Sequence, residues 1–241
     1  MKRYFSLLLL IVLLNPRTTN AQWRFGVIGG VNYSGINPYT NQYYDGGSSA
    51  TTFHKEFFMY RFNAGLQFDF KLGKALHFRP DLLYTQKGWT DHSISGLNQS
   101  TPLEIYTYKV NYVETPLNII YGTPLGNGKV FIGGGPYVAY GIGGKFANKP
   151  FGADWIYGDI VFDKPLTTYP PPPKIGIKRW DYGVNGLIGY EFNFGLTLDL
   201  RYELGIPTVY YKNDIDQILG GTKYDVFSLN VGFLLTRKRT R

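Results

Sequence analysis

The sequence predicts an all-β protein, an eight-stranded antiparallel up-and-down transmembrane β-barrel with short periplasmic turns and long extracellular loops. Three observations predict it. Apolar and polar residues alternate over stretches of ten or more positions, a basic and then apolar leader opens the chain, and the connections between the alternating stretches are alternately short and long. A period of two is typical of strands, whose side chains point alternately to two faces.

Residues 1–21 have the layout of a secretory signal peptide. Lys2 and Arg3 precede the apolar run 5–14, and Pro16 ends that run. The run is about half of the ~20 residues that a membrane-spanning helix needs, so we expect cleavage after Ala21. The chain contains no cysteine, so disulfide bonds do not hold this exported protein together.

The net charge does not indicate a nucleic-acid partner. It is formally +8, but its excess of cations lies at the two ends of the chain. Lys2, Arg3 and Arg17 belong to the signal peptide, and residues 236–241 form a basic tail, which we expect to be periplasmic. A basic groove would need its charge on the folded body, which is almost neutral.

Six stretches alternate cleanly, namely residues 23–34, 58–72, 76–87, 180–192, 196–206 and 227–235. In 58–72 every second residue is apolar, and the residues between include Arg61, Asn63, Gln67, Asp69 and Lys71. Each stretch predicts a strand with one apolar and one polar face.

Two further strands, 105–121 and 130–144, are less regular. In 105–121 the apolar set changes parity, from Tyr106, Tyr108, Val110 and Tyr112 to Val113, Leu117, Ile119 and Tyr121. A β-bulge near residues 112–114 would reconcile the two halves and help to accommodate Pro116. In the glycine-rich stretch 130–144, we expect Tyr137 to point inward and the following residues to point outward: Ile132, Val138, Tyr140 and Ile142.

The connections favour a membrane barrel of residues 22–235. Short turns at 73–74, 123–129 and 193–195 alternate with long loops at 35–57, 88–103, 145–178 and 207–223, as in an up-and-down meander. Ten steps of ~3.3 Å from Trp23 to Tyr33, tilted by ~40°, cover roughly 25 Å, which is the height of an apolar membrane band. Parity alone would also fit a lipocalin-like barrel, but with the export signal and the loop alternation we expect lipid on the apolar face.

The polar face then lines the lumen, which is just wide enough in an eight-stranded barrel for side chains to fill. Because an unpaired buried charge is costly, we expect a salt-bridge network that plugs the lumen, with a proton or ion path as the alternative. The charges assigned to this face are Arg61, Asp69, Lys71, Arg79, Asp81, Lys109, Glu114, Asp181, Glu191, Asp199, Arg201 and Glu203.

Several segments together resemble the PorT-like outer-membrane β-barrel family of the Bacteroidota. They are FGVIGGVNYSG (25–35), LHFRPDLLYTQKGW (76–89), YVETPLNIIYG (112–122), FIGGGPYVAYGIGG (131–144), DYGVNGLIGYEF (181–192) and LTLDLRYELGI (196–206). The similarity covers nearly the whole mature chain. It implies an outer-membrane barrel of a Gram-negative cell with periplasmic N- and C-termini. The family's namesake is associated with type IX secretion, and the resemblance carries no catalytic motif.

No residue set predicts catalysis, a metal site or a cofactor. The histidines are His54, His77 and His92, and residues 91–93 (DHS) only superficially resemble a hydrolytic set, because adjacent residues rarely converge on one reacting atom. There is no zinc-ligand spacing, and the glycines 133–135 lie inside a predicted strand rather than in a phosphate-binding loop.

The long loops are the better candidates for function. Loop 35–57 is dense in Tyr, Asn, Gly and Ser, and loop 145–178 combines aromatic residues with four consecutive prolines. Candidate partner-binding residues are Tyr39, Tyr43, Tyr44, Trp155, Tyr157 and Tyr169. A loop that packs on itself is the alternative for the aromatic cluster.

The sequence therefore predicts a non-enzymatic outer-membrane barrel that binds another envelope component through its loops or its wall, with a secretion-associated role as the specific version. The expected partners are outer-membrane lipid and other envelope or secretion-system proteins. A small-solute pore and a membrane-embedded enzyme are the alternatives.

Overall fold

The computed structural model describes residues 23–37, 40–44, 51–95, 98–164, 174–211 and 221–235. The expected signal peptide and the basic tail lie outside these ranges. Among the residues described there is no helix long and apolar enough to cross a membrane. The strands are β1 (Trp23–Asn37), β2 (Thr40–Tyr44), β3 (Thr51–Lys71), β4 (Leu76–Ser95), β5 (Asn98–Leu125), β6 (Gly128–Pro150), β7 (Ile156–Phe162), β8 (Lys174–Ile177), β9 (Trp180–Phe192), β10 (Leu196–Gly205) and β11 (Lys223–Leu235).

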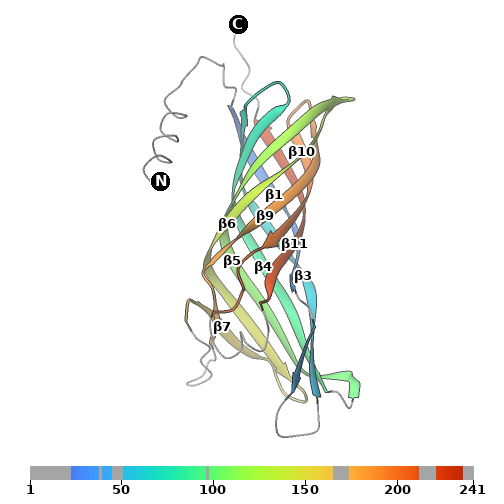
Figure 1. The fold of residues 1–241 in the computed structure, drawn as a ribbon, viewed down its shortest axis with the longest axis vertical. Helices are drawn as coiled ribbons and strands as arrows, with labels where there is room; N and C mark the ends of the chain where they lie inside the picture. The colour runs from blue at the N-terminus through green and yellow to red at the C-terminus, as the bar shows by residue number, and fades with distance from the viewer. Residues whose placement is uncertain are drawn as a thin grey trace, which may run out of the picture.

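Eight of these strands close into a ring. The sheet runs in the order β5-β4-β3-β1-β11-β10-β9-β6, and pairing of β5 with β6 completes the circle. Every neighbouring pair in the ring is antiparallel. Each strand therefore pairs with the next ring strand along the chain, and the eight-stranded up-and-down barrel is confirmed. Figure 1 shows the strands tilted across a tall, narrow ring.

The two ends of the ring differ in their connections. At the short-turn end, residues 72–75, 126–127 and 193–195 join neighbouring strands. Gly126 and Gly195 adopt positive φ angles of 55° and 103°, which a side chain would oppose and which make these turns tight. The longer connections, including β2, β7 and β8, lie at the other end, which we call the long-loop end (Figure 1). The long loop expected at 88–103 is wrong, because β4 and β5 extend as paired strands through this range and only residues 96–97 lie between them.

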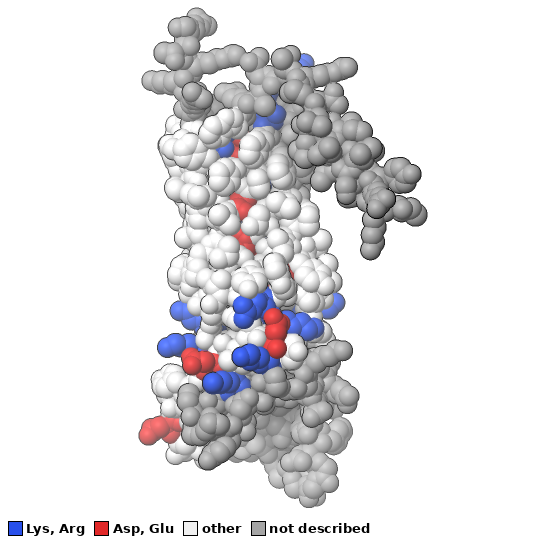
Figure 2. Space-filling model, turned by 90° about the vertical axis from the view of Figure 1, so that its left-hand side faces the viewer, with Lys and Arg blue, Asp and Glu red and all other residues white. Residues whose placement is uncertain are grey.

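The outer wall of the ring is apolar and its inner face is polar. On β10, Leu200 is 58% exposed whereas its neighbour Asp199 is 3% exposed, and the same alternation holds around the ring. Figure 2 shows the wall as a broad surface almost free of charged side chains, followed by a band of Lys, Arg, Asp and Glu toward the long-loop end. The apolar residues therefore face outward over the uncharged part of the wall, as the alternation predicts.

Beyond the apolar wall, the ring continues as a second, shorter segment, which we call the collar. It consists of the parts of β3 to β6 nearest the long-loop end, strands β7 and β8, and residues 206–211. Lys145–Asn148 of β6 pairs with Ile156–Asp159 of β7, and β7 pairs in parallel with β8. Backbone hydrogen bonds from Lys178 to Val209 and from Tyr211 to Gly176 then join β8 to residues 206–211. The collar thus replaces β9 and β10 once those strands have ended.

The bulge expected near residues 112–114 of β5 is wrong in position. The β4–β5 register runs without a shift from Thr85 opposite Tyr112 to Pro80 opposite Leu117. The irregularity lies on β6, where Ile142 is the extra residue between two pairs that β5 forms with β6. On β5 the inward positions stay in phase throughout; what changes is that their side chains become aromatic at the level of the collar.

Candidate functional site

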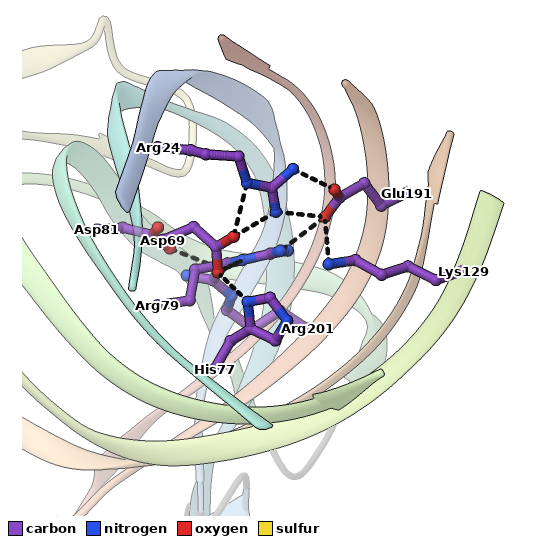
Figure 3. Close-up of polar contacts among 8 residues, drawn as sticks. All are labelled: Arg24, Asp69, His77, Arg79, Asp81, Lys129, Glu191 and Arg201. Atoms are coloured by element: carbon purple, nitrogen blue, oxygen red, sulfur yellow. Dashed lines mark hydrogen bonds and ion pairs between the residues drawn. The ribbon is translucent and has the colours of Figure 1, made fainter. Parts of the chain in front are cut away.

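An ion-pair network fills the lumen near the short-turn end (Figure 3). The guanidinium of Arg24 on β1 lies between two carboxylates, those of Asp69 on β3 and Glu191 on β9. Further contacts at this level are Arg79 to Glu191 at 2.8 Å, His77 to Asp69 at 3.0 Å and Lys129 to Glu191 at 3.3 Å. Strands β1, β3 and β4 are therefore linked across the lumen to β6 and β9.

Two further levels of ion pairs follow along the lumen. Arg201 donates a hydrogen bond to Asp81 at 2.8 Å. Nearer the long-loop end, the ammonium of Lys87, which is 0% exposed, lies 2.9 Å from Glu114, 2.8 Å from Asp181 and 3.6 Å from Glu203. One buried cation therefore serves three carboxylates from three different strands.

Aromatic side chains fill the lumen of the collar. We call this cluster the aromatic plug; its members are Trp89, Tyr108, Tyr112, Tyr137, Phe146, Phe162, Tyr210 and Tyr224, all buried. Trp89 stacks on Tyr108 with 4.3 Å between ring centroids, and Tyr210 meets Trp89 edge-on at 5.9 Å. The ammonium of Lys87 lies 4.4 Å from the ring centroid of Tyr137, so the ion pairs and the plug are in contact. In the described residues, side chains occupy the lumen from the short-turn end to the collar.

Most of the charges predicted to line the lumen do so. Asp69, Arg79, Asp81, Glu114, Asp181, Glu191, Asp199, Arg201 and Glu203 are all buried.

The prediction of a lumen position is wrong for three of the charged residues. Lys71 is exposed at the short-turn end, and Lys109 is exposed on the outside of the collar. Arg61 lies where the β3–β4 register shifts, and it donates hydrogen bonds to the carbonyls of Tyr60 and Tyr108 at 3.0 Å instead of entering the lumen.

Arg24 and Lys87 also belong to the network, although the set of twelve predicted lumen charges does not include them. The alternation in residues 23–34 and 76–87 assigns both of them to the polar face, so the same signal could have found them.

The second feature is a cluster of exposed apolar side chains at the end of the collar, which we call the tip. It consists of Leu103, Phe151, Trp155, Ile156 and Tyr157, between 40% and 72% exposed. The amide of Phe151 donates to the carbonyl of Leu103 at 2.7 Å, which joins the two loop segments. The tip therefore offers aromatic side chains on a backbone that is hydrogen-bonded to the collar.

The apolar residues described in loop 145–178 divide into two groups. Ile160 and Phe162 are 6% and 9% exposed and pack into the plug, whereas Trp155 and Tyr157 are 40% and 68% exposed at the tip. The loop thus packs partly on its own barrel and partly presents side chains outward.

Of the other candidate partner-binding residues, Tyr43 and Tyr44 are described by their backbone pairing alone. The backbones of Tyr43 and Tyr44 pair with Thr52 and Thr51 of β3. Tyr39 and Tyr169 lie outside the described residues.

The chemical groups at the long-loop end do not converge. On β4, Asp91 and Ser93 are buried, whereas His92 points to the outer surface and contacts the ring of Phe57 at 4.6 Å. Partial burial lowers the pKa of His92. His77 contacts Asp69 in the lumen. Within the described part of the chain, no group of three or more His, Cys, Asp or Glu side chains could hold a metal ion.

A closed ring of eight strands with an apolar outer wall and a polar, filled lumen defines the chain as an outer-membrane β-barrel protein. The chain belongs to the family of the outer membrane protein beta-barrel domain, whose model matches residues 16–210. Comparison with curated protein sequences finds no match.

Three solved structures illustrate the likeness of fold. OprG from Pseudomonas aeruginosa is 12% identical, with 90% of this chain and 98% of that chain covered and a TM-score of 0.44. Ail of Yersinia pestis, in complex with the heparin analogue sucrose octasulfate, is 12% identical, with 89% and 99% covered and a TM-score of 0.38. Neisserial surface protein A (NspA) is 14% identical, with 88% and 97% covered and a TM-score of 0.36.

Proposed function

We propose that this chain is a non-enzymatic binding protein of the outer membrane. The barrel anchors it, the N- and C-termini lie in the periplasm, and the collar rises outside the cell, where the tip contacts another envelope component. The observation that carries the proposal is the exposure of Phe151 and Tyr157, at 72% and 68%, on a backbone that is hydrogen-bonded to the collar. Rigidly held, exposed aromatic side chains are the groups that most often anchor protein interfaces.

A small-solute pore is the weaker alternative. It needs an open lumen, and in the described residues the lumen is occupied by ion pairs around Lys87 and by the aromatic plug. The enzyme alternative is weaker still, because an enzyme needs an acid–base set that converges at the collar, and the described groups there do not converge. The secretion-associated version of the proposal, with a type IX component as the partner, rests on the resemblance to the PorT-like family.

The test is crosslinking at single positions in the native outer membrane. A photoreactive residue replaces Tyr157 at the tip, Leu200 on the apolar wall, or Lys74 at the short-turn end. We expect one protein to be captured from Tyr157 in near-equal amounts, and the other two positions not to capture it. The triple variant F151S/W155S/Y157S should no longer co-purify with that protein, although its barrel should resist unfolding in detergent as the wild type does.

Two outcomes would contradict the proposal. If capture occurs at Leu200 and not at Tyr157, the apolar wall rather than the tip binds the partner. If the purified barrel conducts ions steadily in a planar bilayer and no position captures a protein, the pore alternative replaces the binding proposal.

A further inference from the structure

Three lysines form a row across the outside of the collar. Lys109 of β5 lies opposite Lys145 of β6, Lys145 opposite Asp159 of β7, and Asp159 opposite Lys174 of β8. All four side chains are exposed. We call Lys109, Lys145 and Lys174 the lysine row.

The row carries an unbalanced positive charge. Side chains directly opposite each other on an antiparallel pair lie close together, so the ammonium groups of Lys109 and Lys145 repel each other. Asp159 offsets part of this charge, but only on the side of Lys145 that faces β7. Among the described residues none of the three lysines forms an ion pair. An anion shared by Lys109 and Lys145 would relieve the repulsion.

The position of the row relative to the apolar wall indicates what kind of anion this is. Ile142, which is 51% exposed, precedes Lys145 by three residues on β6, and Val113, which is 40% exposed, follows Lys109 by four on β5. At ~3.3 Å per residue and a tilt near ~40°, the row lies roughly 8–10 Å beyond these last apolar side chains. A lysine side chain can cover part of that distance, so the ammonium groups reach the level of lipid headgroups.

An aromatic girdle lies between the apolar wall and the row, because Tyr140 precedes Lys145 by five residues on β6 and pairs with Trp180 of β9. Tyr140 and Trp180 meet edge-on at 4.9 Å, and Arg179 donates a hydrogen bond to the hydroxyl of Tyr140 at 2.9 Å. Tyr and Trp are enriched at membrane interfaces. Arg179, whose carbonyl accepts a hydrogen bond from the amide of Gly141, adds a cation at the level of this girdle, although Asp163 lies 3.7 Å from its Nε.

We propose that the lysine row binds the phosphate groups of a lipid in the leaflet that meets the collar, while the acyl chains of that lipid lie along the wall at Ile142 and Val113. The ligand class is a lipid with phosphates in its headgroup, such as the phosphorylated glycolipid of a Gram-negative outer leaflet. The lipid is favoured over an acidic protein because the row lies only roughly 8–10 Å beyond the apolar wall, at the level of the headgroups of lipids that cover that wall. Lys109 and Lys145 form the core of the site, and Lys174 extends it.

The experiment uses the full mature chain in detergent, titrated with bis-phosphorylated lipid A and, in parallel, with the same lipid after its phosphates have been removed. Binding is read by native mass spectrometry. The test variant is K109Q/K145Q, and the matched control is K55Q/K223Q, which removes two exposed lysines from β3 and β11 at the same end of the barrel. None of these four lysines enters the lumen network, so all variants should fold.

We expect wild type and K55Q/K223Q to prefer the phosphorylated lipid, and K109Q/K145Q to bind it about 30-fold more weakly, because each basic residue near a charged lipid surface contributes about fivefold. Three results would overturn the proposal. They are equal affinity of wild type for both lipids, equal loss in the test and control variants, and complete displacement of the lipid by millimolar inorganic phosphate, which would indicate an anion site without lipid.

Discussion

Lys87 on β4 and Asp181 on β9 meet inside the barrel, with 2.8 Å between the ammonium nitrogen and a carboxylate oxygen. The two residues lie 94 positions apart in the sequence, and neither side chain reaches the outer surface. Tyr137 donates a further hydrogen bond to the same carboxylate at 3.1 Å. The pair lies at the boundary between the ion-pair network and the aromatic plug, so it connects the two halves of the lumen.

Replacing Lys87 by Met should therefore destabilise the barrel strongly. The change leaves the carboxylates of Glu114, Asp181 and Glu203 buried without their shared cation, and breaking a buried ion pair from one side costs about 3–5 kcal/mol. Asp181→Asn should cost less, because Lys87 keeps Glu114 at 2.9 Å. Urea unfolding in lipid-free detergent measures both free energies.

Lys109→Met is the matched control for this prediction. It makes the same chemical change on the exposed outside of the collar, where substitutions usually change the free energy of unfolding by no more than about 0.5 kcal/mol. If Lys87→Met were as stable as Lys109→Met, the ion pairs would not hold the lumen together, and an open, hydrated lumen would have to be considered.

The barrel could be predicted from the sequence because lipid imposes one rule on every strand that crosses it. An apolar side chain at every second position marks the lipid-facing side, as Leu198, Leu200 and Leu204 do on β10. Six such stretches, two less regular ones and the alternation of short and long connections were enough to give the ring and its two ends.

The collar could not be predicted because the same alternation has the opposite meaning there. Outside the membrane, water surrounds the ring, so Tyr108 points inward and Lys109 outward, although the backbone stays in phase. The parity change in 105–121 was therefore a change of surroundings rather than a bulge. The pairing of β6 with β7 and of β7 with β8, which buries Ile160 and exposes Tyr157, depends on contacts between segments and has no local signal.

Leu200→Arg tests which face meets lipid. Leu200 is 58% exposed in the middle of the apolar wall, and a charge at that depth should cost about 2–4 kcal/mol in a bilayer. Tyr157→Arg is the control, because Tyr157 is 68% exposed at the tip, where water surrounds the collar. Folding yield in lipid vesicles distinguishes them. Equal yields of the two variants would mean that the wall does not face lipid.

Two glycines on β9 test the tightness of the ring. A Cβ on Gly183 would lie 1.9 Å from the carbonyl oxygen of Leu204 and 2.8 Å from the ring of Tyr137, whereas a Cβ on Gly186 would meet only the carbonyl of Gly133 at 4.0 Å. Gly183→Ala should therefore cost about 1–3 kcal/mol, since the neighbouring strand must move. Gly186→Ala should leave the midpoint of urea unfolding unchanged or raise it slightly.

If both alanine variants unfold at the wild-type midpoint, β9 and β10 are not packed as closely as these distances indicate. If Gly186→Ala is the more damaging of the two, close packing inside the ring is not the reason for these glycines, and contacts on the outer surface of the wall are.

Glu56 on β3 should make the stability of the collar depend on pH. It lies opposite Asp91 of β4, four residues beyond Tyr60 and thus outside the apolar wall, and both carboxyl groups are buried. Burial, and then the neighbouring charge of Asp91, raise the pKa of Glu56 from 4.5 to about 8. Between these two values the folded state binds more protons than the unfolded state, so stability is greatest at low pH and falls as the pH rises toward 8.

Hydrogen exchange of the β3 and β4 amides in the collar, corrected for the intrinsic pH dependence of exchange, should show less protection at pH 8.5 than at pH 5.5. Glu56→Gln should abolish most of this difference, because glutamine fills the same space without a charge. Asp159→Asn removes an exposed carboxylate from the same collar and should leave the difference intact. If the Glu56→Gln protein keeps the wild-type pH dependence, another group controls it, and the burial of the Glu56 carboxyl does not govern the opening of the collar.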